Sequence, residues 1–200
     1  MKNTTPRWSR YSRQERFARF TVFLGFGVAF AASMRKVEVI PEFLIDAPQQ
    51  VDDSFKVLKA LESAGIRLDI NGVDNVSSHD GPVIIVGNHM SMMETLLLPV
   101  IIQPVKSITF VVKEDLLSYP VFKYVMRSRN PIAVTRTNPR QDLKTVMNDG
   151  AARVKDNISV IVFPQTTRSH TFDAKQMSSI GVKLAKKAGV SIVPLALKTD

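Results

Sequence analysis

The pattern of apolar and polar residues changes at Pro82. From there, short apolar runs alternate with stretches in which apolar residues recur at helical spacing. The runs at 83–86, 108–112, 132–136, 159–163 and 191–197 predict strands, and helices are expected from about Met92 and across 120–127, 139–155 and 178–188. Continuous apolar strands that alternate with helices are typical of a sheet covered on both faces. The sequence therefore predicts an α/β fold, with a largely parallel sheet flanked by helices.

Residues before Pro82 follow other patterns. Apolar residues recur at helical spacing across 54–64 and stop at Gly65, which predicts a helix. Apolar and charged residues then alternate in residues 66–70, IRLDI, which predicts a half-exposed strand ending at the Asn-Gly turn that follows.

A Pro- and acid-rich linker, IPEFLIDAPQQVDD, separates an N-terminal segment from the rest of the chain. We therefore expect two parts: a basic-aromatic segment with its linker at 1–50, and the α/β domain at 51–200.

The N-terminal segment combines many basic residues with an uncharged, largely apolar run. Residues 1–36 hold eight basic residues and one acid, which leaves +7 of the chain's net charge of +9. Residues 20–34 are uncharged but fall short of the roughly 20 apolar residues of a spanning helix. We expect a helical segment that associates with an anionic membrane surface at the cytoplasmic face. A cleaved signal peptide and a buried core helix are the alternatives, although basic residues at 35 and 36 argue against export.

Composition excludes several kinds of site. The chain has no cysteine, so a Cys nucleophile, a Cys-ligated metal and a disulfide are all excluded. Only three histidines are present, and no metal or other cofactor is expected. Residues 37–200 carry a net charge of only +2, which makes a nucleic-acid-binding module the least favoured class.

The stretch VGNHMSMMET, residues 86–95, joins the first predicted strand of the domain to a helix. His89 in this junction is either a structural histidine held in a turn or a general base. Glu94 completes the capping-box pattern S-x-x-E with Ser91, in which the carboxylate bonds the first amides of the helix. A carboxylate beside a histidine also fixes its tautomer and stabilises its charged form. The spacing allows both interpretations of Glu94.

A second loop, VFPQTTRS at 162–169, follows the fourth predicted strand. Arg168 supplies a planar charged fork suited to phosphate, and Thr166 and Thr167 supply hydroxyls. Arg136 ends another strand, and the carboxyl ends of parallel strands share one edge of a sheet. These residues predict a phosphate pocket, with ordinary solvated loop arginines as the alternative.

The order of these pieces resembles the glycerolipid acyltransferase family, and especially its 1-acylglycerol-3-phosphate acyltransferases. The matching blocks are N-H-x-x-x-x-E at 88–94, a strand that ends in Arg136, FPQTTRS at 163–169 and IVPL at 192–195. The departures are Glu94 for the family's aspartate, Gln165 and Thr166 for the glutamate and glycine of the third block, and Asn130 for a glycine. Asparagine tolerates the positive φ that such a glycine adopts. The chain also ends soon after Pro194, where members of this family usually continue, so the resemblance implies further C-terminal structure in the domain at 51–200.

The resemblance implies an O-acyltransferase of phospholipid biosynthesis, a transferase of lipid metabolism. It would move a fatty acyl group from acyl-CoA or acyl carrier protein to a hydroxyl of a lysophospholipid at a membrane. His89 would act as general base and Glu94 as its partner, without an acyl-enzyme. The residues expected to bind substrate are Asn88, Arg136, Gln165, Thr166, Thr167 and Arg168. The altered third block leaves two alternatives, another lipid acceptor or a catalytically silent lipid-binding protein.

Overall fold

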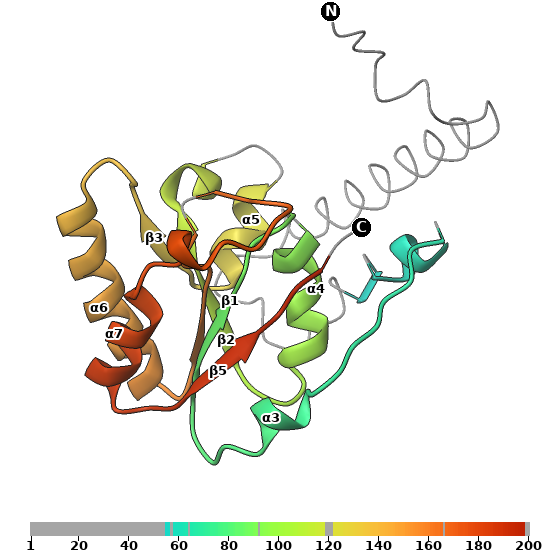
Figure 1. The fold of residues 1–200 in the computed structure, drawn as a ribbon, viewed down its shortest axis with the longest axis horizontal. Helices are drawn as coiled ribbons and strands as arrows, with labels where there is room; N and C mark the ends of the chain where they lie inside the picture. Colours follow the sequence, from blue (N-terminus) through green and yellow to red (C-terminus); the bar gives the residue numbers. More distant parts are fainter. Residues whose placement is uncertain are drawn as a thin grey trace, which may run out of the picture.

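The computed structural model describes residues 55–198, except for residues 57, 64, 92, 119–121 and 166. Segment 1–50, with its predicted membrane contact, lies outside the described residues, so that contact stays a prediction. Within the described part the predicted fold class is confirmed, because helices cover both faces of a parallel sheet (Figure 1). None of the helices described there is long and apolar enough to cross a membrane.

Five strands form the sheet in the order β3-β2-β4-β1-β5, and every neighbouring pair is parallel. The strands are β1 (Ile84–Gly87), β2 (Ile108–Lys113), β3 (Ile132–Val134), β4 (Ser159–Val162) and β5 (Ile192–Leu195). Strand β4 lies between β1 and β2 in the sheet, although it comes after both of them in the chain. The loops that follow β1 and β4 are therefore neighbours at the carboxyl edge of the sheet.

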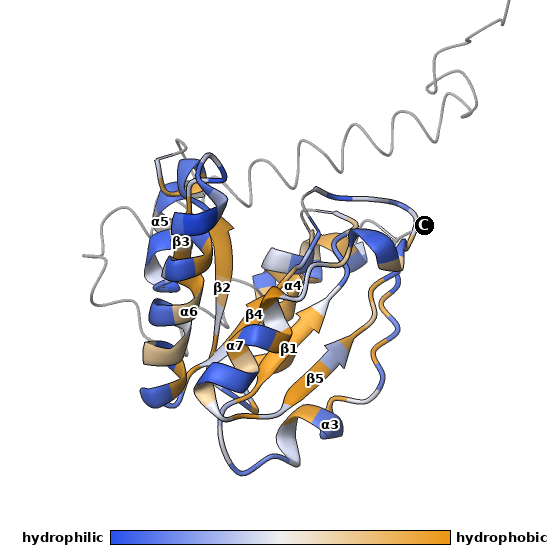
Figure 2. Ribbon diagram, turned by 60° about the vertical axis from the view of Figure 1, so that its left-hand side comes forward, coloured by the Kyte–Doolittle hydropathy of each residue, from blue (hydrophilic) through white to orange (hydrophobic). Residues whose placement is uncertain are grey.

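The helices form two layers. They are α3 (Asp74–Ser77), α4 (Met93–Ile102), α5 (Phe122–Ser128), α6 (Pro139–Lys155) and α7 (Ile180–Ala188), with short 3₁₀ turns η3 (Glu114–Leu117) and η4 (Ala174–Gln176). Helices α6 and α7 lie side by side on one face of the sheet, and α3 and α4 lie on the other (Figure 1). The outer surfaces of α6 and α7 are hydrophilic, while strands β1, β2 and β4 are hydrophobic (Figure 2).

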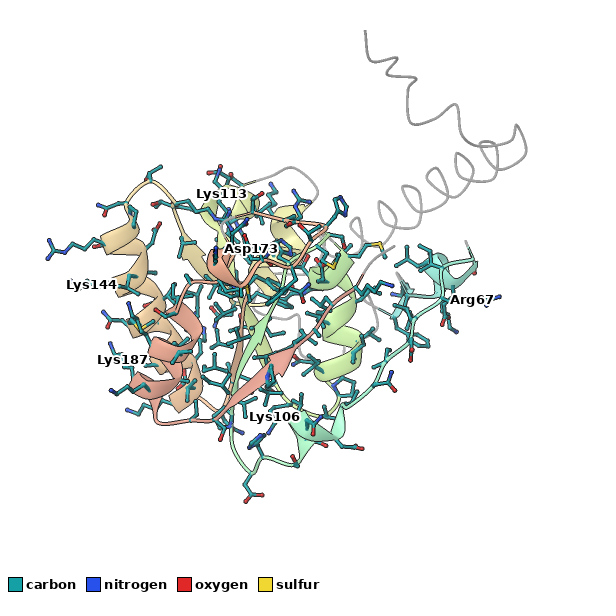
Figure 3. All side chains as sticks on the ribbon, in the orientation of Figure 1. Arg67, Lys106, Lys113, Lys144, Asp173 and Lys187 are labelled. Atoms are coloured by element: carbon teal, nitrogen blue, oxygen red, sulfur yellow. The ribbon has the colours of Figure 1, made fainter. Side chains whose placement is uncertain are left out.

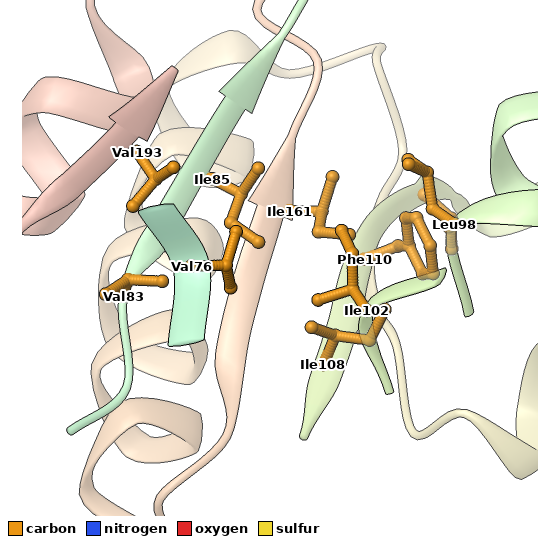
Figure 4. Packing of buried hydrophobic residues seen from close by; sticks show 10 residues of the cluster. Val76, Val83, Ile85, Leu98, Ile102, Ile108, Phe110, Ile161 and Val193 are labelled. Carbon is orange, nitrogen blue, oxygen red and sulfur yellow. The ribbon is translucent and has the colours of Figure 1, made fainter. Parts of the chain in front are cut away.

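Successive residues of a strand point to opposite faces of the sheet, so the strands contribute to two separate cores. Ile84 packs with α6 and α7, whereas the next residue, Ile85, packs with α3 and α4. The core on the α4 side includes Ile85, Ile161, Phe110 and Leu98 (Figure 4). Both faces of β1 and β4 are thus buried, as the continuous apolar runs predicted. The loops that leave these two strands therefore start from a well-packed base.

Helix α7 approaches the sheet closely at Gly181. A Cβ atom there would lie 2.5 Å from Cγ2 of Val86 in β1, so only glycine fits without a shift. Gly189 ends the same helix with φ 69°, the left-handed cap expected of a glycine after the last turn. Asn130, just before β3, has φ 45°, which confirms the predicted positive φ at this position.

The strand predicted at 66–70 is wrong. These residues have no strand partner in the sheet, and Ile66 and Leu68 pack instead against the outer side of α4. The alternation reports one buried side, which an extended segment against a helix shares with an edge strand. The turn predicted after it is confirmed by Gly72 at φ 74°, and the short helix α3 that follows was not predicted.

Candidate active site

The candidate site lies at the carboxyl edge of β1 and β4. His89 comes two residues after the end of β1, and the 163–169 loop follows β4, the neighbouring strand. The main-chain N–H of Ser169 donates to the carbonyl oxygen of His89 at 2.9 Å. The two loops predicted to carry the chemistry are therefore in direct contact, although they are far apart in the sequence.

His89 and Glu94 form a close pair. Nδ1 of His89 lies 3.1 Å from Oε2 of Glu94. The imidazole stays partly open, with 19% of its side chain exposed, while the Glu94 side chain is 3% exposed. A buried carboxylate thus holds one nitrogen of a partly exposed ring.

The second oxygen of Glu94 caps helix α4. Oε1 accepts the main-chain N–H groups of Ser91 at 2.6 Å and Met90 at 3.1 Å. The Oγ of Ser91 accepts the N–H of Met93 at 3.1 Å, at the start of the helix. The capping role and the contact with His89 are therefore both present, because each uses a different oxygen of one carboxylate.

The environment of Glu94 keeps it ionised. Burial raises the pKa of this carboxyl, but the bonds from His89, Ser91 and Met90 together outweigh burial. The net pKa lies below the ordinary value of 4.5. At neutral pH an ionised carboxylate accepts a proton from Nδ1, so the neutral imidazole carries its hydrogen there. Nε2 is left with a lone pair, and it has no hydrogen-bond partner among the described residues.

The ring of Phe163 stacks on the face of the His89 imidazole. The two rings stack with centroids 4.6 Å apart and planes inclined by 16°. Sequence reasoning treated Phe163 as the last residue of a strand and missed this contact. The signal was available in outline, since Phe163 follows a buried strand at the same edge as His89.

Two residues predicted to bind substrate contact the His89 loop instead. The Oε1 atom of Gln165 accepts the main-chain N–H of His89. Asn88 bonds the main chain of Leu197 twice, with Nδ2 donating to the carbonyl oxygen at 2.8 Å and Oδ1 accepting the N–H at 2.7 Å. Gln165 and Asn88 are both buried, at 4% and 8% exposure. Their substrate contacts remain predictions, and the bonds seen here hold the loop that carries His89.

The third block also contains the two threonines. Thr166 lies outside the described residues, and Thr167 is exposed at the same loop. Their expected contacts with substrate are not tested by this geometry. Thr167 has the solvent access that such a contact requires.

Arg168 and Arg136 both follow strands at the carboxyl edge of the sheet, but those strands, β4 and β3, are not neighbours. Arg168 is exposed in the loop after β4. Arg136 is exposed two residues after β3, with φ 62°, and its main-chain N–H donates to Oδ2 of Asp142 at 2.7 Å. Because β2 lies between β4 and β3, the two loops leave strands roughly 10 Å apart. Arg168 is the arginine next to His89, and Arg136 lies further along the edge.

Lys113 fills the position between them and was missed by sequence reasoning. It is the last residue of β2, the strand that separates β4 from β3, and its ammonium group pairs with Asp115. Figure 3 shows it at the opposite end of the molecule from Lys106, which precedes the same strand. The missing signal was the one-residue extension of the strand beyond Val112. Arg168, Lys113 and Arg136 thus place three basic side chains at this edge of the sheet, of which Lys113 is paired with Asp115.

The described residues contain no group of three His, Cys, Asp or Glu side chains close enough to hold a metal ion. What the site does offer is a histidine with one nitrogen bound to a carboxylate and the other nitrogen open, beside the loop that carries Arg168. This arrangement can remove a proton from a hydroxyl group on an anionic molecule.

Comparisons with known proteins show the family to which the chain is similar. Residues 67–198 match the family model described as Acyltransferase. The chain is 32% identical over 133 residues to a 1-acyl-sn-glycerol-3-phosphate acyltransferase of Pseudomonas aeruginosa, covering 66% of this chain and 50% of the relative. It is 30% identical over 142 residues to a protein of the same name from Borreliella burgdorferi, covering 67% and 52%. The chain thus spans about half the length of these curated relatives.

A solved structure shares the fold. The crystal structure of the 1-acyl-sn-glycerophosphate acyltransferase PlsC from Thermotoga maritima aligns with a TM-score of 0.59 and 21% identity, covering 90% of this chain and 74% of that one. At this level of identity the similarity concerns the arrangement of the sheet and helices.

Replacing Glu94 with glutamine tests the geometry of the pair. The amides of Met90 and Ser91 need an oxygen, so the new NH₂ group would face Nδ1 of His89. Nδ1 must then accept, and the proton of the neutral ring moves to Nε2. We expect ¹⁵N NMR of histidine-labelled protein to show the Nδ1–H form in the wild type and the Nε2–H form in Glu94→Gln. The same tautomer in both proteins would contradict the assignment.

The lowered pKa of Glu94 predicts how stability depends on pH. A carboxyl whose pKa is lower in the folded state adds stability above its unfolded value of 4.5, and this is lost as pH falls through the folded pKa. Wild type should therefore be more stable than Glu94→Gln at pH 7, and the difference should shrink steadily below pH 4.5. Urea unfolding of both proteins between pH 7 and pH 3 measures it, and a constant difference would refute the linkage.

Proposed function

The chain belongs to the Acyltransferase family, and from this premise we propose that it transfers a fatty acyl group from a thioester of coenzyme A or acyl carrier protein to a hydroxyl of 1-acylglycerol-3-phosphate. The observation that carries the proposal is the bond between His89 Nδ1 and the ionised Glu94, which leaves Nε2 as a base. The names of the curated relatives supply the acceptor.

The proposed reaction needs no acyl-enzyme. Nε2 of His89 takes the proton of the acceptor hydroxyl while its oxygen attacks the thioester carbonyl carbon. A carbon–oxygen bond forms, the carbon–sulfur bond breaks, and the leaving thiolate receives the proton from Nε2. Glu94 stabilises the imidazolium that exists between these proton transfers. The burial of Glu94 favours this role, since charge interactions are less screened away from water.

The acceptor phosphate would lie against Arg168. This residue is exposed in the loop after β4, the strand next to β1, and it directly precedes Ser169, whose main-chain N–H bonds the carbonyl oxygen of His89. A guanidinium binds phosphate through paired, charge-assisted hydrogen bonds. Lys113, which is paired with Asp115, and Arg136 lie further from His89 along the same edge.

His89→Ala tests the base directly. We expect the full chain to lose transfer by about 100- to 10,000-fold, the usual contribution of a general base. The assay offers acyl-CoA and acyl carrier protein thioesters to a panel of lysolipids, with unfolding curves to confirm that the variant folds. Turnover that survives in His89→Ala would exclude His89 as the base. No turnover by folded wild type with any pair would favour the catalytically silent lipid-binding alternative.

Arg168→Ala tests recognition of the phosphate. We expect kcat/KM for 1-acylglycerol-3-phosphate to fall by about 10- to 100-fold, in line with the loss of a charge-assisted hydrogen bond. Turnover of a monoacylglycerol, which lacks the phosphate, should change little. Arg67→Ala is the matched control, because Arg67 is also exposed but lies away from Lys113 and the site edge (Figure 3). An equal loss with both acceptors would argue that Arg168 does not bind phosphate.

A further inference from the structure

The main chain of His89 is bonded on both sides by the loop that follows β4. Its N–H donates to Oε1 of Gln165, and its carbonyl oxygen accepts the N–H of Ser169. His89 lies beyond the last residue of β1, so the sheet offers it no ladder bonds. The side chain of Gln165 therefore supplies the partner that this N–H would otherwise lack.

The residue before His89 is held in a similar way. Both polar atoms of the Asn88 amide bond the main chain of Leu197, just beyond β5. The His89 loop is thus anchored to the loops on either side of it, because β4 and β5 are the two neighbours of β1. Such anchoring decides where the imidazole lies, since the ring follows the backbone angles of its own residue.

We propose that Gln165 is a positioning residue, which keeps the imidazole against Glu94 by fixing the main chain of His89 and makes no contact with the acceptor lipid. Its burial supports this role, because the side chain is 4% exposed and its oxygen is already bonded. Thr167 and Arg168 in the same loop are exposed and face solvent instead. The activity readout rests on the proposed function, whereas the position of the ring does not.

The chemistry of the bond predicts which replacements are tolerated. A carboxylate oxygen accepts an N–H as well as an amide oxygen does, so Gln165→Glu should keep the anchor. Its negative charge would favour the imidazolium and move the acid limb of the pH–rate profile to higher pH. Gln165→Met has a similar length but accepts no such bond, so it should release the His89 N–H.

A matched control lies at the other edge of the sheet. Gln103 makes the same kind of bond, its Oε1 accepting the main-chain N–H of Ile108 at 3.0 Å, at the amino end of β2. Gln103→Met removes that bond far from His89. It therefore reports what the loss of such a bond does to stability alone.

The experiment compares the full chain with Gln165→Met, Gln165→Glu and Gln103→Met. We expect Gln165→Met to lower kcat by about 10- to 100-fold, as misplaced catalytic groups do, with the acceptor KM nearly unchanged. Gln165→Glu should restore kcat to within a few-fold of wild type, with the acid limb shifted to higher pH. Gln103→Met should keep kcat. Unfolding curves for each variant correct the rates for the folded fraction.

Two results would overturn the proposal. A raised acceptor KM with unchanged kcat in Gln165→Met would make Gln165 a substrate contact. Loss of kcat in Gln103→Met to the same extent would mean that the bond matters only for the fold.

A readout without substrate separates this proposal from the proposed function. In ¹⁵N NMR, Gln165→Met should weaken the preference of neutral His89 for the Nδ1–H tautomer, and His89→Ala identifies the signal among the three histidines. If wild type shows no turnover, the proposed function fails and this tautomer still decides the role of Gln165. An unchanged tautomer in Gln165→Met would overturn the positioning role.

Discussion

The Glu94 carboxylate is the constraint on which the rest of the site depends. One of its oxygens closes the start of helix α4, and the other bonds Nδ1 of His89. Because the carboxylate is buried, it needs these donors to stay ionised, and because it is ionised, it sets the tautomer of the ring. The cap of helix α4 and the tautomer of His89 therefore depend on the same carboxylate. An uncharged side chain at this position cannot satisfy both requirements.

Sheet topology supplies the second half of the site. Parallel strands send their following loops to one edge, and the order β3-β2-β4-β1-β5 makes the loop after β4 the neighbour of the loop after β1. Gln165 and His89 are 76 positions apart in the sequence, yet the side chain of Gln165 bonds the main chain of His89 directly. The buried strands β1 and β4, which pack against α4 and α7, thus fix the distance between His89 and the loop that bonds its main chain.

Residues 83–197 were largely predictable because their periodicity is strong and local. Helix α6 begins and ends where the pattern placed it, and the pairing of His89 with Glu94 was one of two interpretations that the spacing allowed. The failed strand at 66–70 shows the limit, since alternation records a buried side but not what buries it. The partners of Gln165 and Asn88 depend on strand order, which periodicity does not contain. Lys113 was missed because only strand order places it between the two arginine loops.

The neutral side chain at position 165 has a consequence for the charge balance of the proposed reaction. Among the described residues, Glu94 is the carboxylate bonded to His89, while a neutral amide accepts the His89 main-chain N–H. An imidazolium formed by the proposed proton transfer would therefore have one bonded counter-charge, the Glu94 carboxylate. Glutamine at position 165 thus bonds the main chain of His89 without adding a second negative charge beside the His89–Glu94 pair.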